Sequence, residues 1–108
     1  MAGEASAVGD TDFDEQVLAA SMPTVVDFWT ESCAPCKTLA PLLDELATKY
    51  AGRVQIRKMN ATEHPVTSTR YFVRAFPTLL VFKEGRVVDQ VVGMVSRGKL
   101  EDFVTRHL

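Results

Sequence analysis

The sequence contains few cysteines: only two occur among its 108 residues, and they stand close together as Cys33 and Cys36. A small secreted domain that depends on disulfides for stability usually carries more cysteines, spread along the chain. A bridge between residues so near in sequence closes a ring too short to constrain the unfolded chain much. The scarcity of cysteine therefore excludes a disulfide-stapled scaffold and favours a chemical role for the pair.

The sequence also lacks a long apolar run, an excess of basic residues and a typical targeting segment. No stretch approaches the roughly 20 apolar residues that a membrane-spanning helix needs. The formal net charge is −2, whereas proteins that bind nucleic acids or anionic membranes usually carry a basic excess. Residues 1–10 are small and acidic, without the basic flank and apolar core of a secretory signal. We therefore expect a cytoplasmic protein that binds neither nucleic acid nor membranes.

Apolar residues are present in the proportion expected for one folded domain. Hydrophobic residues make up 46% of the chain and charged residues 24%. A chain of this length can bury a core without covalent staples. Because no repeat or linker interrupts the pattern, we predict a single domain over residues 1–108. Within it, residues 1–10 are expected to form a loose lead-in with a short edge strand near residues 5–8.

The apolar pattern of the first half predicts a helix, a buried strand and a second helix. Asp12 is expected to cap the first helix, which ends before Pro23. Residues 24–29 are apolar on both faces apart from Asp27, as in a central strand covered on both sides. A helix over residues 36–50 follows, with leucines at three- and four-residue spacing.

The second half continues the alternation and closes with a hairpin and a helix. We predict a strand over residues 54–59, a helix over 65–72, strands over 78–82 and 87–92, and a final helix capped by Ser96. The final helix is expected to turn Leu100, Phe103, Val104 and Leu108 inward. This order of elements predicts an α/β fold with a mixed sheet between helices.

The two cysteines stand between the buried strand and a helix, which is a favourable place for thiol chemistry. Unpaired N–H groups and the helix dipole stabilise a thiolate of Cys33 at the helix N-terminus. The thiolate is the nucleophile in disulfide exchange. Cys36 lies one turn further along, so its sulfur returns toward Cys33 and can resolve a mixed disulfide. Pro35 restrains the ring that closes on oxidation. We therefore predict that Cys33 attacks and Cys36 resolves.

Asp27 is the candidate base for Cys36. Burial raises the pKa of a carboxyl because it disfavours the charged form. A proton acceptor for Cys36, acting directly or through a water, is one interpretation; a carboxylate turned to solvent at the end of the strand is the other. Lys58, near the end of the next strand, is either its ionic partner or an ordinary surface charge.

Two other uses of a C-x-x-C motif fit poorly. Structural zinc needs four ligands, and this chain offers only two cysteines plus His64 and His107 far downstream. Haem attachment requires histidine directly after the second cysteine, where this chain has Lys37. We therefore expect no metal site and no bound cofactor.

The chain resembles the thioredoxin family from about Thr11 to Leu108. The resemblance is carried by an ordered set of segments: Val26–Trp29, Cys33–Lys37, Ala40–Pro41, Phe76–Leu79, Phe82–Gly85 and Val92–Gly93. It implies a thioredoxin fold, with a five-stranded mixed sheet flanked by four helices, and the activity of a protein disulfide reductase. It also implies that Pro77 is cis and lies beside Cys33, that Asp27 is the buried acid, and that Lys58 is its partner.

The resemblance further implies a substrate groove and a set of partners. The backbone around Phe76 would pair with an extended substrate, and Gly93 would form the floor of the groove. The residues expected to contact substrate are Trp29, Ser32, Ala34, Pro35, Phe76, Pro77 and Gly93. Disulfide-containing proteins would be the substrates of a monomeric enzyme, and a flavin-dependent thioredoxin reductase would supply its electrons.

The chain departs from the family pattern at the active site. Ser32 replaces the usual tryptophan before the first cysteine, and Ala34 replaces the usual glycine between the cysteines. Arg74 adds a charge shortly before Phe76, where the family often has a small residue. These departures suggest an altered recognition surface. A binding or chaperone-like module with little turnover, and a more oxidising isomerase-like protein, remain the alternative functions.

Overall fold

A central five-stranded sheet organises residues 5–108, the part of the chain that the computed structural model describes. The strands are β1 (Ser6–Ala7), β2 (Thr24–Trp29), β3 (Gln55–Asn60), β4 (Thr78–Lys83) and β5 (Arg86–Val92). They lie in the order β1-β3-β2-β4-β5. β3 runs parallel to β1 and β2, whereas β4 runs antiparallel to β2 and β5. The predicted mixed sheet is confirmed.

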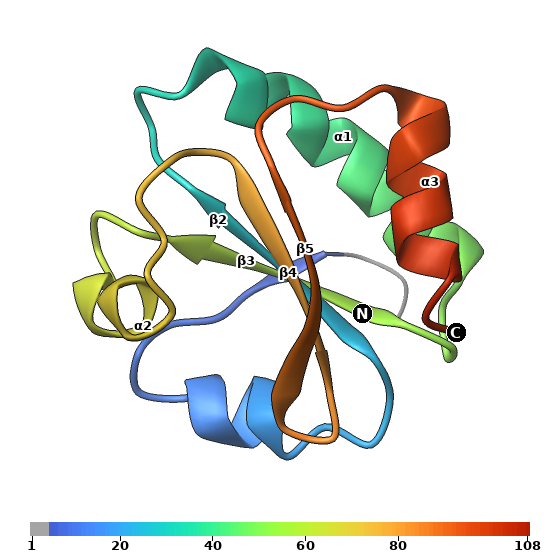
Figure 1. Ribbon diagram of the computed structural model, residues 1–108, viewed down its shortest axis with the longest axis horizontal. Helices are drawn as coiled ribbons and strands as arrows, with labels where there is room; N and C mark the ends of the chain where they lie inside the picture. Colours follow the sequence, from blue (N-terminus) through green and yellow to red (C-terminus); the bar gives the residue numbers. More distant parts are fainter. Residues whose placement is uncertain (1–4) are drawn as a thin grey trace.

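Helices cover both faces of this sheet. They are η1 (Asp14–Leu18), α1 (Ala34–Lys49), α2 (Pro65–Arg70) and α3 (Arg97–Thr105). Figure 1 shows α1 and α3 together on one side of the sheet and α2 with the first helix on the other. The described residues thus form the expected α/β fold with four helices.

The alternation of side chains along β2 divides the core into two layers. Val25 packs with the buried faces of α1 and α3. Val26 and Phe28 point the other way, into a cluster with Phe13, which directly precedes η1, and Phe82 of β4. Because Asp27 shares the face of Val25, the strand presents its carboxyl group toward α1.

The first helix differs from the prediction. It is a short π-helical segment, in which Ala19 N donates to Asp14 O at 2.9 Å. Asp12 makes no cap at its start; instead, its Oδ1 accepts a hydrogen bond from Gly9 N at 2.8 Å. The cap prediction was wrong because the preceding turn uses this carboxylate.

Residues 5–10 of the predicted lead-in are more ordered than expected. Residues 1–4 lie outside the described part of the chain, and β1 confirms the expected edge strand. Val8 is buried, and Asp10 accepts hydrogen bonds from Val66 N at 3.2 Å and Thr67 N at 2.8 Å. Because these contacts join segments far apart in sequence, no local pattern could reveal them.

The ends of two helices also differ from the prediction. α1 begins at Ala34 rather than near Cys36: Cys33 is its N-cap residue, and Ala34 and Pro35 belong to its first turn. α3 ends at Thr105, so Leu108 falls beyond it and is 38% exposed instead of facing inward. The predicted Ser96 cap is confirmed, since its side chain accepts a hydrogen bond from Lys99 N at 3.3 Å.

Candidate active site

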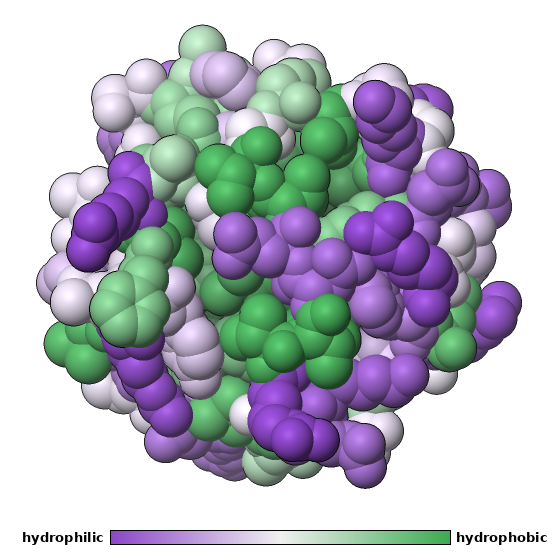
Figure 2. Space-filling model, viewed as in Figure 1, coloured by the Kyte–Doolittle hydropathy of each residue, from purple (hydrophilic) through white to green (hydrophobic). Residues whose placement is uncertain are grey.

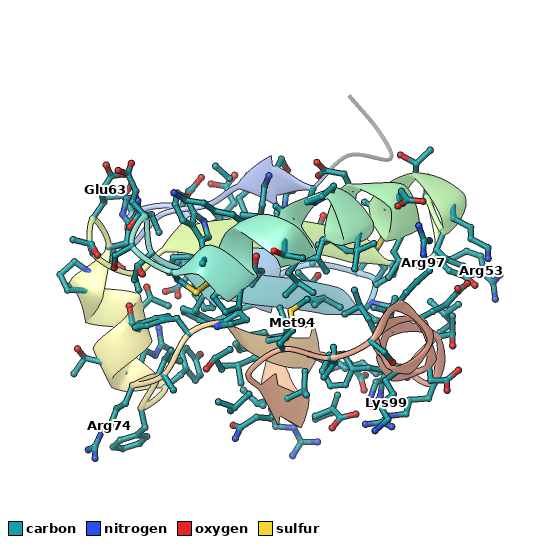
Figure 3. The ribbon with its side chains drawn as sticks, turned by 90° about the horizontal axis from the view of Figure 1, so that it is seen from above. Arg53, Glu63, Arg74, Met94, Arg97 and Lys99 are labelled. Atoms are coloured by element: carbon teal, nitrogen blue, oxygen red, sulfur yellow. A yellow bond between two sulfur atoms is a disulfide. The ribbon has the colours of Figure 1, made fainter. Side chains whose placement is uncertain are left out.

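A disulfide joins Cys33 and Cys36 at the start of α1, with a Cα–Cα distance of 5.3 Å (Figure 3). Cys33 is the N-cap residue, and its Sγ accepts a hydrogen bond from Cys36 N at 3.2 Å. Cys33 is half-buried, whereas Cys36 is only 3% exposed. A protein partner can therefore reach the first sulfur more easily than the second.

The sequence around the cysteines explains this geometry. β2 ends at Trp29, and a short turn leads to Cys33, whose N–H donates to Thr30 O at 3.3 Å. Pro35 has no N–H to leave unpaired in the first turn of α1. Of the N–H groups in that turn, Cys36 N donates to the Cys33 sulfur. In the reduced protein this arrangement favours the thiolate.

Asp27 is buried, with 1% of its surface exposed. Its Oδ1 is shielded from solvent and accepts no hydrogen bond from any residue between 5 and 108. Burial raises the pKa of Asp27 from 3.8 to about 7, although the positive charge of Lys58 acts in the opposite direction. A carboxylate turned to solvent, one of the two interpretations of the sequence, is therefore wrong.

A small pocket connects Asp27 with the second cysteine. It has a volume of about 170 Å³, and its walls include Asp27, Trp29, Cys36 and Lys58. A cavity of this size with polar groups in its walls has room for water, because one molecule needs only about 10–15 Å³ of probe-occupied volume. The pocket therefore joins the carboxyl group of Asp27 and the buried Cys36 through a space that can hold water.

Lys58 lies beside Asp27 in the sheet, because the two residues are register partners across β2 and β3. Its closest anion, however, is Asp44 of α1, with Nζ 3.9 Å from Oδ1. Lys58 thus acts on Asp27 through its charge rather than through a hydrogen bond. Sequence reasoning missed Asp44, and no sequence signal marks it, since the contact depends on how α1 crosses β3.

The expected groove residues gather at one end of the sheet. Thr78, the first residue of β4, pairs with Phe28 near the end of β2 and with Val92 at the end of β5. The cysteine turn after β2, Pro77 before β4 and Gly93 after β5 therefore lie at the same end of the sheet. The Phe76–Pro77 peptide bond is cis, as expected. Gly93 N donates to Pro77 O at 2.8 Å and has a φ of 90°, which a side chain would rarely permit.

The other residues expected at the substrate surface are accessible. Trp29 and Phe76 are half-buried, whereas Ser32, Ala34 and Pro35 are exposed. Ser32 is exposed, and its hydroxyl lies 3.5 Å from that of Thr30.

Residues 5–108 contain no cluster of three or more His, Cys, Asp or Glu side chains that could hold a metal ion. No helix in the same range is long and apolar enough to cross a membrane.

Comparisons with known proteins agree with this geometry. The family model described as Thioredoxin matches residues 4–106. Thioredoxin 1 of Synechococcus elongatus is 42% identical over 104 residues, covering 96% of this chain and 97% of that protein. Thioredoxin C-2 of Corynebacterium nephridii is 46% identical over 99 residues, covering 92% of each chain. The chloroplastic M-type thioredoxin of Pisum sativum is 41% identical, covering 97% of this chain and 61% of that protein.

Proposed function

The chain belongs to the thioredoxin family and is a thiol–disulfide oxidoreductase, and from this premise we propose how its residues divide the reaction. The Cys33 thiolate attacks one sulfur of a substrate disulfide, forming a mixed disulfide and releasing the other sulfur as a thiolate that takes up a proton. Cys36 then loses its proton and attacks Cys33 Sγ. The second substrate thiol leaves, and the Cys33–Cys36 disulfide remains, so two electrons have passed to the substrate.

The single observation that carries this division is the contrast between the two sulfurs. Cys33 is half-buried at the helix N-terminus, where Cys36 N reaches its sulfur at 3.2 Å, whereas Cys36 is buried. A thiolate at Cys33 is stabilised by that donor and by the helix dipole. The accessible, stabilised thiolate attacks; the shielded thiol reacts only with the neighbouring sulfur.

We assign Asp27 the role of base for Cys36. A pKa of about 7 lets the carboxylate accept a proton at neutral pH and return it later. The pocket that both residues line supports transfer through water. Lys58, which also pairs with Asp44, assists by favouring the charged form of Asp27.

Protein disulfides are the substrates in this proposal. A substrate strand would pair with the backbone at Phe76, beside Pro77 and above Gly93, with Trp29, Ser32, Ala34 and Pro35 as the opposite wall. We propose that a thioredoxin reductase recharges the dithiol, and that the protein acts as a monomer in the cytoplasm. The Pisum sativum relative is named as chloroplastic, so a fractionation experiment is the test of location.

Replacing Cys36 by serine should trap mixed disulfides between Cys33 and substrate proteins. The attack by Cys33 is retained, but the resolving thiol is gone, so the intermediate accumulates. Non-reducing gels followed by mass spectrometry of the adducts measure this outcome. The matched control is a variant in which both cysteines are serine. Adducts joined through another group, or equal adduct levels in the control, would contradict the proposed order.

Replacing Ser32 by tryptophan should increase the turnover of a generic protein disulfide. An aromatic ring at this exposed position would cover the disulfide and contact the partner, which typically contributes about two- to tenfold in rate constant. The measurement is kcat/KM for insulin reduction, with Ser32→Ala as the control for loss of the hydroxyl. If Ser32→Trp and Ser32→Ala behave alike, the missing ring is not what limits recognition.

A further inference from the structure

Phe72 is 79% exposed, more than any other large apolar side chain in residues 5–108. Its φ of 58° lies in the left-handed region, which bulky residues rarely adopt because Cβ crowds the backbone. An exposed aromatic ring and a strained backbone are both unfavourable for stability. Their coincidence at one residue calls for a functional reason.

The end of α2 explains the backbone conformation but not the ring. Val73 N donates to Ser68 O at 2.9 Å, and Phe72 N donates to Thr69 O at 3.0 Å. This pair of bonds ends a helix with one left-handed residue, which is usually glycine. Glycine would satisfy the turn without strain, so the turn does not require the phenyl ring.

The core does not hold the ring either. The preceding Tyr71 points inward, with ring centroids 5.7 Å from Phe13 and 5.1 Å from Phe82. The reversal of the chain at Phe72 leaves its side chain outside this cluster. Tyr71 therefore packs against the core at this helix end, and the exposed ring of Phe72 is available to contact a partner.

Phe72 instead forms one wall of a pocket of about 170 Å³ between the α2–β4 segment and β5. Val92 of β5, 49% exposed, forms another wall, and Gln90 and Thr78 also line the pocket. The volume is below the roughly 300–1,000 Å³ of small-molecule sites, but it suits one side chain. Figure 2 shows green apolar patches along β5, separated by purple residues. Phe72 and Val92 give the pocket an apolar side, which favours an aliphatic occupant, whereas Gln90 and Thr78 make part of its lining polar.

Arg74 places a positive charge at the rim of this pocket. It is exposed and has no ion pair within the described range 5–108, and Figure 3 shows it pointing away from the molecule beside α2. The neighbouring Arg70, in contrast, already pairs with Asp14 at 3.2 Å. The free guanidinium group is suited to a carboxylate on the partner.

The pocket continues the groove at the end of the sheet, because Val92 precedes Gly93 and Thr78 follows Pro77. Phe72 lies four residues before Phe76, a span of no more than about 14 Å in extended chain. An extended substrate paired at Phe76 can reach the pocket within a few residues of its cysteine.

We propose that the Phe72–Val92 pocket selects disulfide substrates in which an aliphatic side chain, followed by an acidic residue, lies within a few residues of the reacting cysteine. The aliphatic side chain fills the pocket, and the carboxylate pairs with Arg74. Phe72 and Arg74 are thus specificity-determining residues. This inference rests on the proposed function and adds a substrate preference to it.

The test uses synthetic peptides whose single cysteine forms a mixed disulfide with thionitrobenzoate. In one set a Leu–Glu pair moves residue by residue along both sides of the cysteine; in the matched set Ser–Lys takes its place. The reduced protein releases the coloured thiolate, and the readout is the ratio of rate constants between matched peptides. We expect a ratio of about ten or more at one placement, as for a filled apolar pocket.

Phe72→Gly should lower this ratio toward one while leaving the melting temperature unchanged or higher, because glycine relieves the left-handed strain. Arg74→Glu should reverse the preference for glutamate over lysine. Val87→Ala is the matched control, because Val87 is also exposed on β5 but does not line the pocket; it should keep the wild-type ratio.

A wild-type ratio near one at every placement, with normal release of the coloured thiolate, would overturn the pocket proposal and leave the oxidoreductase function intact. Failure of the wild type to react with any peptide would instead overturn the proposed function. Sedimentation of the wild type as a dimer that Phe72→Gly dissociates would assign the surface to a second copy of the chain and would also overturn the proposal.

Discussion

Replacing Cys33 by serine should abolish catalysed disulfide exchange. The hydroxyl is not ionised at neutral pH and cannot replace the thiolate as nucleophile, so the expected loss is on the order of a thousandfold or more. Cys36 cannot substitute for it, because its side chain is only 3% exposed. Release of thionitrobenzoate from its symmetrical disulfide, followed under single-turnover conditions, measures this loss.

The matched control for Cys33→Ser is Cys36→Ser. The control retains the accessible thiol and should release coloured thiolate in the first step, although it cannot complete the cycle. The two variants therefore separate attack from resolution. Equal first-step rates in Cys33→Ser and wild type would mean that Cys36 attacks, and the assignment of roles would be reversed.

Replacing Asp27 by asparagine should stabilise the protein at neutral and higher pH. The pKa of Asp27 is about 7 in the folded protein against 3.8 for an ordinary aspartate. Between these values the folded state binds more protons than the unfolded state, so stability falls as pH rises. The total loss is roughly 4 kcal/mol. Asparagine does not titrate and removes this penalty, although its amide still needs hydrogen-bond partners.

Urea unfolding of wild type and Asp27→Asn measures the effect. We expect the variant to be about 2–4 kcal/mol more stable above about pH 8, and the difference to shrink below about pH 5. Asp89→Asn is a control: burial acts to raise the pKa of that partly exposed carboxyl, but its hydrogen bonds to His107 and Arg106 outweigh burial and lower the pKa. A pH-independent difference between Asp27→Asn and wild type would contradict the raised pKa.

Asp27→Asn should also slow the attack of Cys36 on the mixed disulfide, because Cys36 would lose its proton acceptor. The expected loss is about a hundredfold, typical for removal of a general base. Accumulation of the mixed disulfide in single-turnover experiments measures it. A wild-type rate of resolution in Asp27→Asn would show that the buried carboxyl group is not the base.

The sequence predicts the sheet and its site well because their signals are local. The run of apolar residues around Asp27 identifies β2 as a central strand, and the structure buries the carboxyl accordingly. The hairpin between β4 and β5 is equally readable. Glu84 and Gly85 have φ values of 53° and 77°, as a two-residue turn with positive φ at both central positions requires.

What the sequence does not reveal depends on contacts between distant segments. The carboxylate of Asp10 accepts hydrogen bonds from the first turn of α2, and the pairing of Lys58 with Asp44 depends on how α1 crosses β3. Phe72 is a different case. It occupies a left-handed position where glycine is usual, so a rule based on glycine cannot locate that helix end.

Dithiothreitol-driven reduction of insulin, with wild type beside Cys33→Ser, tests the central claim most directly. The claim is that the accessible cysteine and its buried neighbour form a catalytic dithiol for protein disulfides. It predicts rapid precipitation of the insulin B chain with wild type and the uncatalysed rate with the variant. Reduction by the wild type no faster than by dithiothreitol alone would contradict the claim.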